Sequence, residues 1–179
     1  MEIATPRLII RDIRADDTDA LAYTKEDKYS YHKATRPHPE DRLDIEIARN
    51  VISMSEKPQR FWSLVIALKE TQTVIGSIRI YTSPASPSIG EIGFDLNEIY
   101  WRKDYTTEAV RAVTAYCHDI LKMHRVSIRA DVNNIASWRV AEKAGMQYEG
   151  IARYDFRTWQ GFIPEMKIYA SVRPELIAA

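Results

Sequence analysis

Residues 91–113, EIGFDLNEIYWRKDYTTEAVRAV, carry the pattern that decides the fold. Residues 91–96 predict a strand, a short basic loop follows, and a helix is expected to begin near Thr106. The backbone N–H groups and the dipole at a helix N-terminus favour bound anions. Arg102 and Lys103 lie in the loop and could pair with phosphates. The stretch therefore predicts either a phosphate-binding strand–loop–helix unit or a solvated loop with two incidental cations.

Hydrophobic periodicity on both sides of this stretch predicts the element order β α α β β β α β α β β. We expect strands at residues 7–13, 61–68, 74–81, 91–96, 126–132, 148–158 and 162–172. We expect helices at residues 16–25, 40–54, 106–121 and 135–144. Helices on both faces of a mixed sheet are the natural packing for this order, so the sequence predicts a mixed α+β fold.

Four local predictions concern packing and turns. The helix at residues 40–54 should bury one apolar face, because apolar residues recur on it at helical spacing: Leu43, Ile47, Val51 and Met54. Residues 82–88, TSPASPS, are rich in Pro and Ser and should form a surface loop. Gly145 should cap the preceding helix in a left-handed conformation, and Gln160–Gly161 should form a hairpin turn.

Composition limits the class of protein. A chain of 179 residues with 45% hydrophobic residues fits a single globular domain spanning residues 1–179. Lys plus Arg equals Asp plus Glu at 25 each, which argues against a nucleic-acid or anionic-membrane partner. The single cysteine, Cys117, excludes an internal disulfide and agrees with a reducing compartment. Because the sequence has neither a signal-peptide pattern nor an apolar membrane span, the expected location is cytoplasmic.

Four separated motifs resemble those of one known family. The run E-I-G-F-x-L-x-x-x-Y-W-x-K-x-Y-x-T-E-A-V-R-A at residues 91–112 resembles the coenzyme A-binding segment of GNAT acetyltransferases. It is most similar to the branch that includes the ribosomal-protein N-terminal acetyltransferases. Residues 134–150 are similar to that branch's second signature, N-x-x-S followed by a helix, E-K-x-G and an aromatic-E-G turn. The opening T-P-R-L-I-I-R and the closing G-x-x-x-E-x-x-x-Y at residues 161–169 also resemble the ends of that branch.

The resemblance implies a fold and a co-substrate. The fold is a central mixed, splayed sheet of six to seven strands, with acetyl-CoA in the cleft between the two strands that diverge. The pantetheine of acetyl-CoA would run along Ile92, Gly93 and Phe94. The pyrophosphate would meet the loop residues Trp101, Arg102, Lys103, Asp104, Tyr105, Thr106 and Thr107. The next helix would complete the cofactor site with Asn134, Ser137 and Lys143.

The same resemblance suggests catalytic residues for direct transfer of the acetyl group to an amine. Ser137 is the candidate acid that protonates the leaving thiolate, because the tyrosine that many GNAT enzymes carry four residues later is replaced by Ala141. Ser137 could instead be a helix N-terminal hydroxyl that satisfies a backbone donor. Glu91 and Asp155 are the candidate bases. Asp155 lies on the first of the two closing strands, where related enzymes carry a carboxylate, but the matching position nearest the hairpin turn is Arg157 in this chain. A strand-end carboxylate could equally be a plain surface charge.

The loop departs from the family pattern. Related loops read like W-G-x-G-Y-A, whereas this chain has WRKDYT at residues 101–106. Asp104 can adopt the left-handed conformation that a glycine would supply. Its carboxylate would oppose a bound phosphate if it pointed inward, and would have little effect if it faced solvent. Its side chain could also cap the following helix and occupy the donors that CoA needs.

Two functions follow as hypotheses. The first is an acetyl-CoA-dependent N-acetyltransferase that modifies a primary amine, either a protein N-terminus or a small amine. The alternative is a non-catalytic GNAT-like binding or scaffold domain with impaired CoA binding. Under either hypothesis the chain could be a monomer or a homodimer. No metal is expected, because the four histidines show no ligand spacing with one another or with Cys117. Cys117 lies on the apolar face of its helix and is expected to be a core residue.

Overall fold

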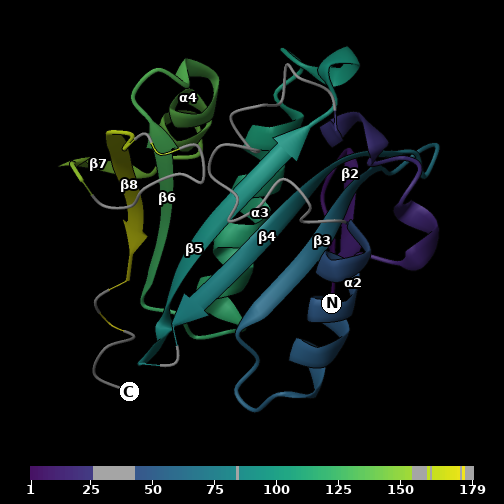
Figure 1. The fold of residues 1–179 in the computed structure, drawn as a ribbon, viewed down its shortest axis with the longest axis horizontal. Coiled ribbons are helices and arrows are strands. Elements are labelled where there is room, and N and C mark those ends of the chain that lie inside the picture. Colours follow the sequence, from purple (N-terminus) through teal and green to yellow (C-terminus); the bar gives the residue numbers. More distant parts are fainter. Residues whose placement is uncertain (26–42, 84, 155–160, 162, 174, 176–179) are drawn as a thin grey trace.

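The computed structural model describes residues 1–25, 43–83, 85–154, 161, 163–173 and 175 (Figure 1). Its strands are β1 (Glu2–Ala4), β2 (Leu8–Asp12), β3 (Phe61–Leu68), β4 (Val74–Ser83), β5 (Ser86–Leu96), β6 (Arg125–Asp131), β7 (Gln147–Ala152) and β8 (Met166–Val172). Its α-helices are α2 (Leu43–Ser55), α3 (Tyr105–Asp119) and α4 (Ile135–Lys143). Its short 3-10 helices are η1 (Ala15–Asp17), η2 (Ala22–Lys25) and η4 (Glu98–Tyr100). From α2 onward, the order of strands and α-helices is the predicted one.

The strands of the described residues form one eight-stranded mixed sheet in the order β1-β2-β3-β4-β5-β6-β8-β7. Neighbouring strands are antiparallel except for β5 and β6, which are parallel. The mixed α+β fold is therefore confirmed, but six to seven strands is too low a number. The additional strand is β1, whose Ile3 pairs with Ile10 of β2. A three-residue edge strand is held by backbone pairing and is too short to show a side-chain period.

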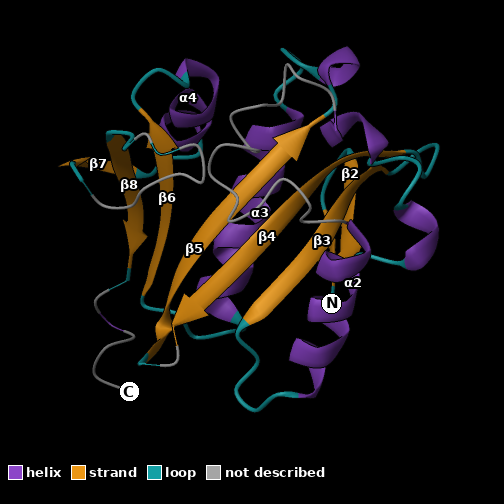
Figure 2. Ribbon diagram, viewed as in Figure 1, coloured by secondary structure: helices purple, strands orange, loops and turns teal. Residues whose placement is uncertain are grey.

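The two faces of the sheet carry different helices. β3 is buried on both faces, as its continuous apolar run predicts. Leu64 and Ile66 belong to the same core cluster as Val110 of α3. Val65, which lies between them, packs on the opposite face with Leu21. Figure 2 shows α3 behind the sheet and α2 in front of it. Helices on both faces are thus confirmed.

The prediction of one helix at residues 16–25 is wrong, because this segment forms the two short helices η1 and η2. Asp17 anchors the start of this segment. Its buried carboxylate accepts a hydrogen bond from the backbone N–H of Arg14 at 2.8 Å. It also accepts two from the guanidinium of Arg11, both at 2.8 Å. The bond to the Arg14 N–H is of the kind that caps a helix N-terminus, so it does not account for the break between η1 and η2.

The predicted packing of α2 holds at Ile47, which is partly buried against the core, but not at the later apolar positions. Val51 and Met54 are 61% and 55% exposed, whereas Asn50 and Ser53 are buried against the sheet. The side-chain oxygen of Asn50 accepts a hydrogen bond from the N–H of Ser63 at 2.9 Å. The hydroxyl of Ser53 accepts one from the N–H of the first residue of β3 at 3.0 Å. The edge of β3 that extends past β2 therefore takes its partners from α2, and this requirement turns the polar side of the helix inward.

The remaining local predictions have mixed outcomes. The prediction of a surface loop at residues 82–88 is wrong. β4 extends to Ser83, which pairs with Ser86 of β5 after a shift in the register of the two strands. Gly145 has a φ of 90° directly after α4, which confirms the left-handed cap. β7 and β8 cover shorter ranges than expected. Gln160, which was predicted to lie in a hairpin turn, is outside the described residues.

Candidate functional site

The candidate site lies where the parallel strands β5 and β6 separate. They pair over only three positions, the last of which joins Glu91 to Ser127, whereas β6 pairs with β8 over seven. Beyond Glu91 the two strands diverge (Figure 1), and from Ile92 to Phe94 the edge of β5 that faces β6 has no strand partner among the described residues. Antiparallel pairing with β4 uses only alternate backbone groups of β5, so the other groups point into this opening. A ligand could hydrogen-bond to them.

Both strands lead from this opening into helices at the same edge of the sheet. Because β5 and β6 are parallel, their C-terminal ends lie together, which is where ligands bind in α/β sheets. β5 continues through η4 and residues 101–104 into α3, and β6 continues through residues 132–134 into α4. The N-termini of α3 and α4 therefore flank the opening.

The loop at residues 101–104 has the backbone conformation of a glycine-containing loop without the glycines. Asp104 has a φ of 57° and a ψ of 17°, and Arg102 has a φ of 62°. These are the two positions at which the related motif W-G-x-G carries glycine. The left-handed conformation is uncommon for residues other than glycine, although Asp tolerates it. The left-handed conformation predicted for Asp104 is confirmed, and it extends to Arg102.

The N-terminus of α3 keeps its donors available. The first intrahelical bond runs from the N–H of Glu108 to the carbonyl of Asp104 at 3.0 Å. The N–H groups of residues 105–107 consequently have no intrahelical acceptor. Asp104 occupies the N-cap position, but its side chain makes no capping hydrogen bond. The expectation that Asp104 caps the helix with its carboxylate is therefore wrong, and the helix end remains suited to an anion.

The Asp104 carboxylate bonds to a cation at the far end of α4. Lys143 Nζ donates a hydrogen bond to its Oδ1 at 2.7 Å, and both side chains are more than half exposed. This hydrogen bond, together with the charge of Lys143, lowers the pKa of Asp104. The guanidinium of Arg111 donates to the carbonyl of Lys143 and ties α3 to the end of α4. A pocket of about 600 Å³ lies here, and Arg111 and both members of the ion pair line it.

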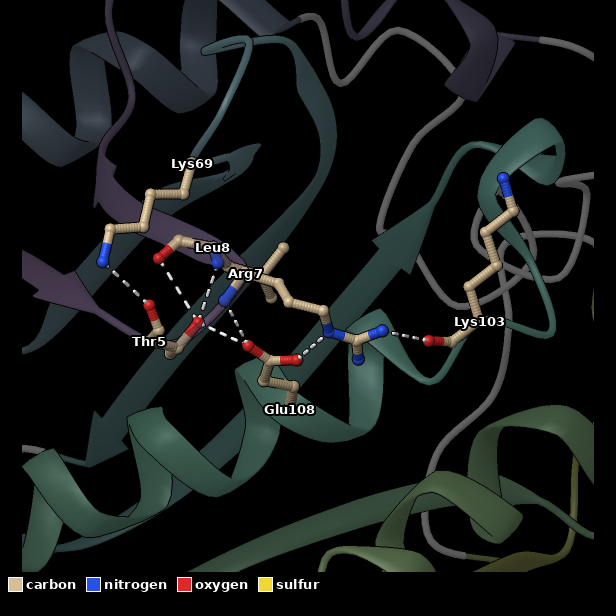
Figure 3. A network of polar contacts seen from close by, with 6 residues as sticks. All are labelled: Thr5, Arg7, Leu8, Lys69, Lys103 and Glu108. Carbon is tan, nitrogen blue, oxygen red and sulfur yellow. Dashed lines mark hydrogen bonds and ion pairs between the residues drawn. The ribbon is translucent and has the colours of Figure 1, made fainter.

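A polar network holds the other side of the loop (Figure 3). Arg7 donates from Nε to Glu108 Oε2 at 2.6 Å and from Nη1 to the carbonyl of Lys103 at 3.0 Å. The Thr5 hydroxyl donates to Glu108 Oε1 at 2.6 Å. Burial opposes ionisation of Glu108, but the hydrogen bonds from Thr5 and Arg7 outweigh it and lower the pKa of Glu108. The start of the chain is thus bonded to the first turn of α3 and to the loop before it.

Glu91 lies at the point where the strands part, on the face opposite α3. Its neighbour Ile92 packs into the cluster that contains α3, and successive side chains of a strand alternate between faces. The Glu91 side chain is 44% exposed, and its Oε2 lies 3.9 Å from Nη1 of Arg129 on β6. Partial burial of the carboxyl raises the pKa of Glu91, and the charge of Arg129 opposes that rise. Asp155, the other candidate base, lies outside the described residues.

Asn134 and Ser137 sit together at the start of α4. Asn134 is the N-cap residue, and its Oδ1 accepts a hydrogen bond from the N–H of Ser137 at 3.2 Å. The capping role considered for the Ser137 hydroxyl therefore belongs to Asn134. The half-buried Ser137 hydroxyl has no hydrogen-bond partner among the residues that the structure describes. The Asn134 side chain retains its amide nitrogen as a donor.

Comparison with known proteins identifies the family. A model described as the acetyltransferase (GNAT) domain matches residues 7–147. The chain belongs to the GNAT acetyltransferase family. It is 25% identical over 178 residues to the uncharacterized N-acetyltransferase p20 of Bacillus licheniformis, and the match covers 96% of each chain. The family and such relatives make it an acyltransferase enzyme.

Solved structures agree with this GNAT fold. RimL, a ribosomal L7/L12 α-N-protein acetyltransferase in complex with coenzyme A, has a TM-score of 0.79 at 15% identity, covering 96% of this chain and 98% of that one. An acetyltransferase from Salmonella typhimurium that modifies the N-terminal serine of 50S subunit protein L7/L12 has a TM-score of 0.80 at 16% identity, covering 97% and 99%. At these identities the likeness establishes the fold. The structural neighbours include members of the Rim-type branch, which the sequence motifs resemble.

The other residues proposed for this GNAT site lie around the same opening. Ile92 is buried and Phe94 is partly buried on β5, and Gly93 lies between them. The Trp101 indole donates to the carbonyl of Leu96 at 2.7 Å, which folds the loop back onto the end of β5. Thr106 and Thr107 are buried in the first turn of α3. Arg102 and Lys103 are exposed beside this turn.

Sequence reasoning missed three residues that attach the start of the chain to the first turn of α3, next to the candidate site: Thr5, Arg7 and Glu108. Their signal was present in the T-P-R-L and T-T-E-A runs, but a contact between residues 101 positions apart has no local pattern. Arg129 was also missed, since a cation on a strand has no period that marks it as a partner of Glu91.

Other features of the GNAT domain complete the description. Cys117 is buried in the core, and burial raises its pKa to about 12, so it is confirmed as a core residue and is not a thiolate nucleophile. Among the described residues, no group of three or more His, Cys, Asp or Glu side chains is placed to hold a metal ion. No helix in that part of the chain is long and apolar enough to span a membrane.

Proposed function

We propose that this chain transfers an acetyl group directly from acetyl-CoA to a primary amine, either a protein N-terminus or a small amine. The observation that carries the proposal is the separation of β5 from β6 after Glu91, next to an α3 N-terminus whose amides lack intrahelical acceptors. The open edge of β5 can hydrogen-bond to an amide-containing chain, and the N-terminus of α3 can bind a diphosphate. Acetyl-CoA, the co-substrate of the GNAT family, has both parts.

The chain offers distinct groups to each part of acetyl-CoA. The pantetheine would lie along residues 92–94 and receive the free amide donor of Asn134. The pyrophosphate would accept hydrogen bonds from the N–H groups of residues 105–107. Arg102 and Lys103 are close in sequence to this helix end and would contribute positive charge. Lys143 would approach the same phosphates if it exchanged its partner Asp104 for them.

The chemistry divides between Glu91 and Ser137. Glu91 would accept the proton of the attacking amine, directly or through a water, and burial, which raises its pKa, makes the carboxylate a stronger base. The nitrogen–carbon bond would form first and give a tetrahedral intermediate; the carbon–sulfur bond would then break, and the Ser137 hydroxyl would supply a proton to the leaving thiolate. Backbone N–H groups at the open edge of β5 would stabilise the oxyanion of the tetrahedral intermediate.

Release of free CoA thiol tests the proposal. The protein would be incubated with acetyl-CoA and two groups of acceptors, peptides with free N-termini and small primary amines. We expect thiol release that depends on the acceptor, with acetylated product by mass spectrometry. Glu91→Gln should reduce this release strongly while leaving acetyl-CoA binding unchanged. Binding of acetyl-CoA without turnover on any acceptor would favour the alternative, a GNAT-like binding domain.

A further inference from the structure

We propose that Arg7 is a positioning residue that fixes the direction of the backbone N–H groups in the coenzyme loop. This inference rests on the proposed function, because it concerns the loop assigned to the pyrophosphate. Arg7 lies just before β2, far in sequence from the loop, yet its guanidinium bonds to the Lys103 carbonyl in the loop and to Glu108 in the first turn of α3 (Figure 3). Nothing in the proposed chemistry requires Arg7 to touch the reacting atoms.

The contacts of Arg7 enclose residues 103–108. Nη1 donates to the carbonyl of Lys103 at 3.0 Å, and Nε donates to the carboxylate of Glu108 at 2.6 Å. The guanidinium carbon also lies 4.6 Å from the centre of the Tyr105 ring. One planar group thus bonds to the last carbonyl before the N-cap residue and to the first turn of the helix. Only an arginine offers donors in a rigid fork that can do both at once and stack on a ring.

The bond to Lys103 sets the orientation of the following amide. A trans peptide is planar, so its carbonyl and its N–H point in opposite directions. When Arg7 holds the Lys103 carbonyl toward the start of the chain, the N–H of Asp104 must point away from it. The Asp104 N–H, which has no backbone acceptor among the described residues, directly precedes the N–H groups of residues 105–107 that lack intrahelical acceptors. Arg7 therefore keeps this donor directed away from the start of the chain, beside the anion site.

The loop needs such a restraint because it has lost its glycines. Arg102 and Asp104, on either side of Lys103, both hold positive φ values that residues with a Cβ adopt at a cost. Glycines would reach this conformation freely, whereas this chain must favour it through contacts. The Lys103 carbonyl lies between the two strained residues, so a hydrogen bond to it acts on both. Arg7 supplies that bond.

Thr5 provides a matched control for this inference. Its hydroxyl donates to Glu108 Oε1 at 2.6 Å and accepts from the N–H of Leu8 at 2.8 Å. It anchors the same carboxylate as Arg7, but its side chain makes no hydrogen bond to residues 101–104 in the described structure. Loss of Thr5 should therefore weaken the attachment of α3 to the start of the chain without releasing the Lys103 carbonyl.

The experiment compares the acetyl-CoA affinity of three variants with wild type by calorimetry, with melting temperatures measured alongside. Arg7→Met should weaken binding by about tenfold or more, as expected if the Asp104 N–H no longer makes a charge-assisted hydrogen bond to the pyrophosphate. Arg7→Lys keeps the charge but not the fork, and it should recover less than half of that loss. Thr5→Val should lower the melting temperature and leave the affinity within about twofold of wild type.

The outcomes separate the possible explanations. Full recovery by Arg7→Lys would mean that only the charge matters and would overturn the positioning role. A loss in Thr5→Val equal to that in Arg7→Met would assign the effect to general destabilisation and would overturn it as well. Wild-type binding with an unaffected Arg7→Met would refute this inference alone. Absence of wild-type binding would instead refute the proposed function, and this inference with it.

Discussion

Replacement of Asp104 by Asn is the most informative change in the loop. Asn tolerates the left-handed backbone conformation that Asp104 adopts, so the path of the loop should survive. The substitution removes one negative charge beside the proposed pyrophosphate site. It also releases Lys143, whose Nζ lies 2.7 Å from the Asp104 carboxylate in the free protein. Both effects should strengthen the binding of acetyl-CoA.

The magnitude follows from the exposure of the two side chains. Asp104 and Lys143 are 59% and 58% exposed, so a dielectric close to that of water applies. For a phosphate charge about 5 Å away, Coulomb's law then gives about a fourfold change in affinity. At about 1 M salt the Debye length is about 3 Å, shorter than that separation, so most of the gain should disappear.

Calorimetric titration with acetyl-CoA at low and high salt measures this effect. Asp104→Asn should bind about fourfold more tightly than wild type at low salt, with a smaller difference at high salt. Lys143→Met should change the affinity in the opposite direction, and the double variant should return close to wild type because the net charge is restored. A weaker or unchanged affinity for Asp104→Asn at low salt would refute the electrostatic reasoning.

Three further predictions concern single residues. Ser137→Ala should lower kcat, measured by thiol release, by about tenfold to a thousandfold, while the acetyl-CoA affinity measured by calorimetry stays nearly unchanged. Turnover equal to that of wild type would make Ser137 a structural residue. Activity should require ionised Glu91 and should therefore fall with decreasing pH. Arg129→Met should move that fall to higher pH, because the charge of Arg129 lowers the pKa of Glu91. An unchanged pH–rate profile in this variant would contradict the assignment. Glu108 has a lowered pKa, so its ionised form adds stability above the pKa of the unfolded chain, and this is lost as pH falls through the folded pKa. Glu108→Gln should therefore melt below wild type near neutral pH, the two melting temperatures should converge in acid, and a constant difference would count against the ionised contact.

The sequence was sufficient for features that depend on local pattern. The buried run of β3, the long amphipathic helix α3 and the αL cap at Gly145 are each determined by residues close in the chain. The left-handed conformation of Asp104 was also predictable, because few residue types besides glycine tolerate it. The motifs then placed these elements in a known fold, including the splay that no local pattern reveals.

Features that depend on distant partners were not predictable. The apolar spacing of α2 suggested a buried face, but Asn50 turns inward to serve a β3 amide 13 residues away. The segment expected to form the first helix forms two short helices instead, and the Asp17 carboxylate in it bonds to the guanidinium of Arg11. Arg7 was part of a recognised motif, yet its contact with Glu108 depends on the tertiary fold. The contacts of Asn50 and Arg7 join separate elements of the fold, so no local pattern marks them.

Backbone amide NMR shifts recorded during titration with acetyl-CoA test the central claim most directly. The proposed site predicts saturable binding, with the largest shift changes at residues 92–94 on β5 and 104–107 at the start of α3, and small changes on β1 and β7. The side-chain amide of Asn134 should shift in parallel. No change up to millimolar acetyl-CoA, or changes confined to strands away from the β5–β6 opening, would contradict the claim that this opening is the acetyl-CoA site.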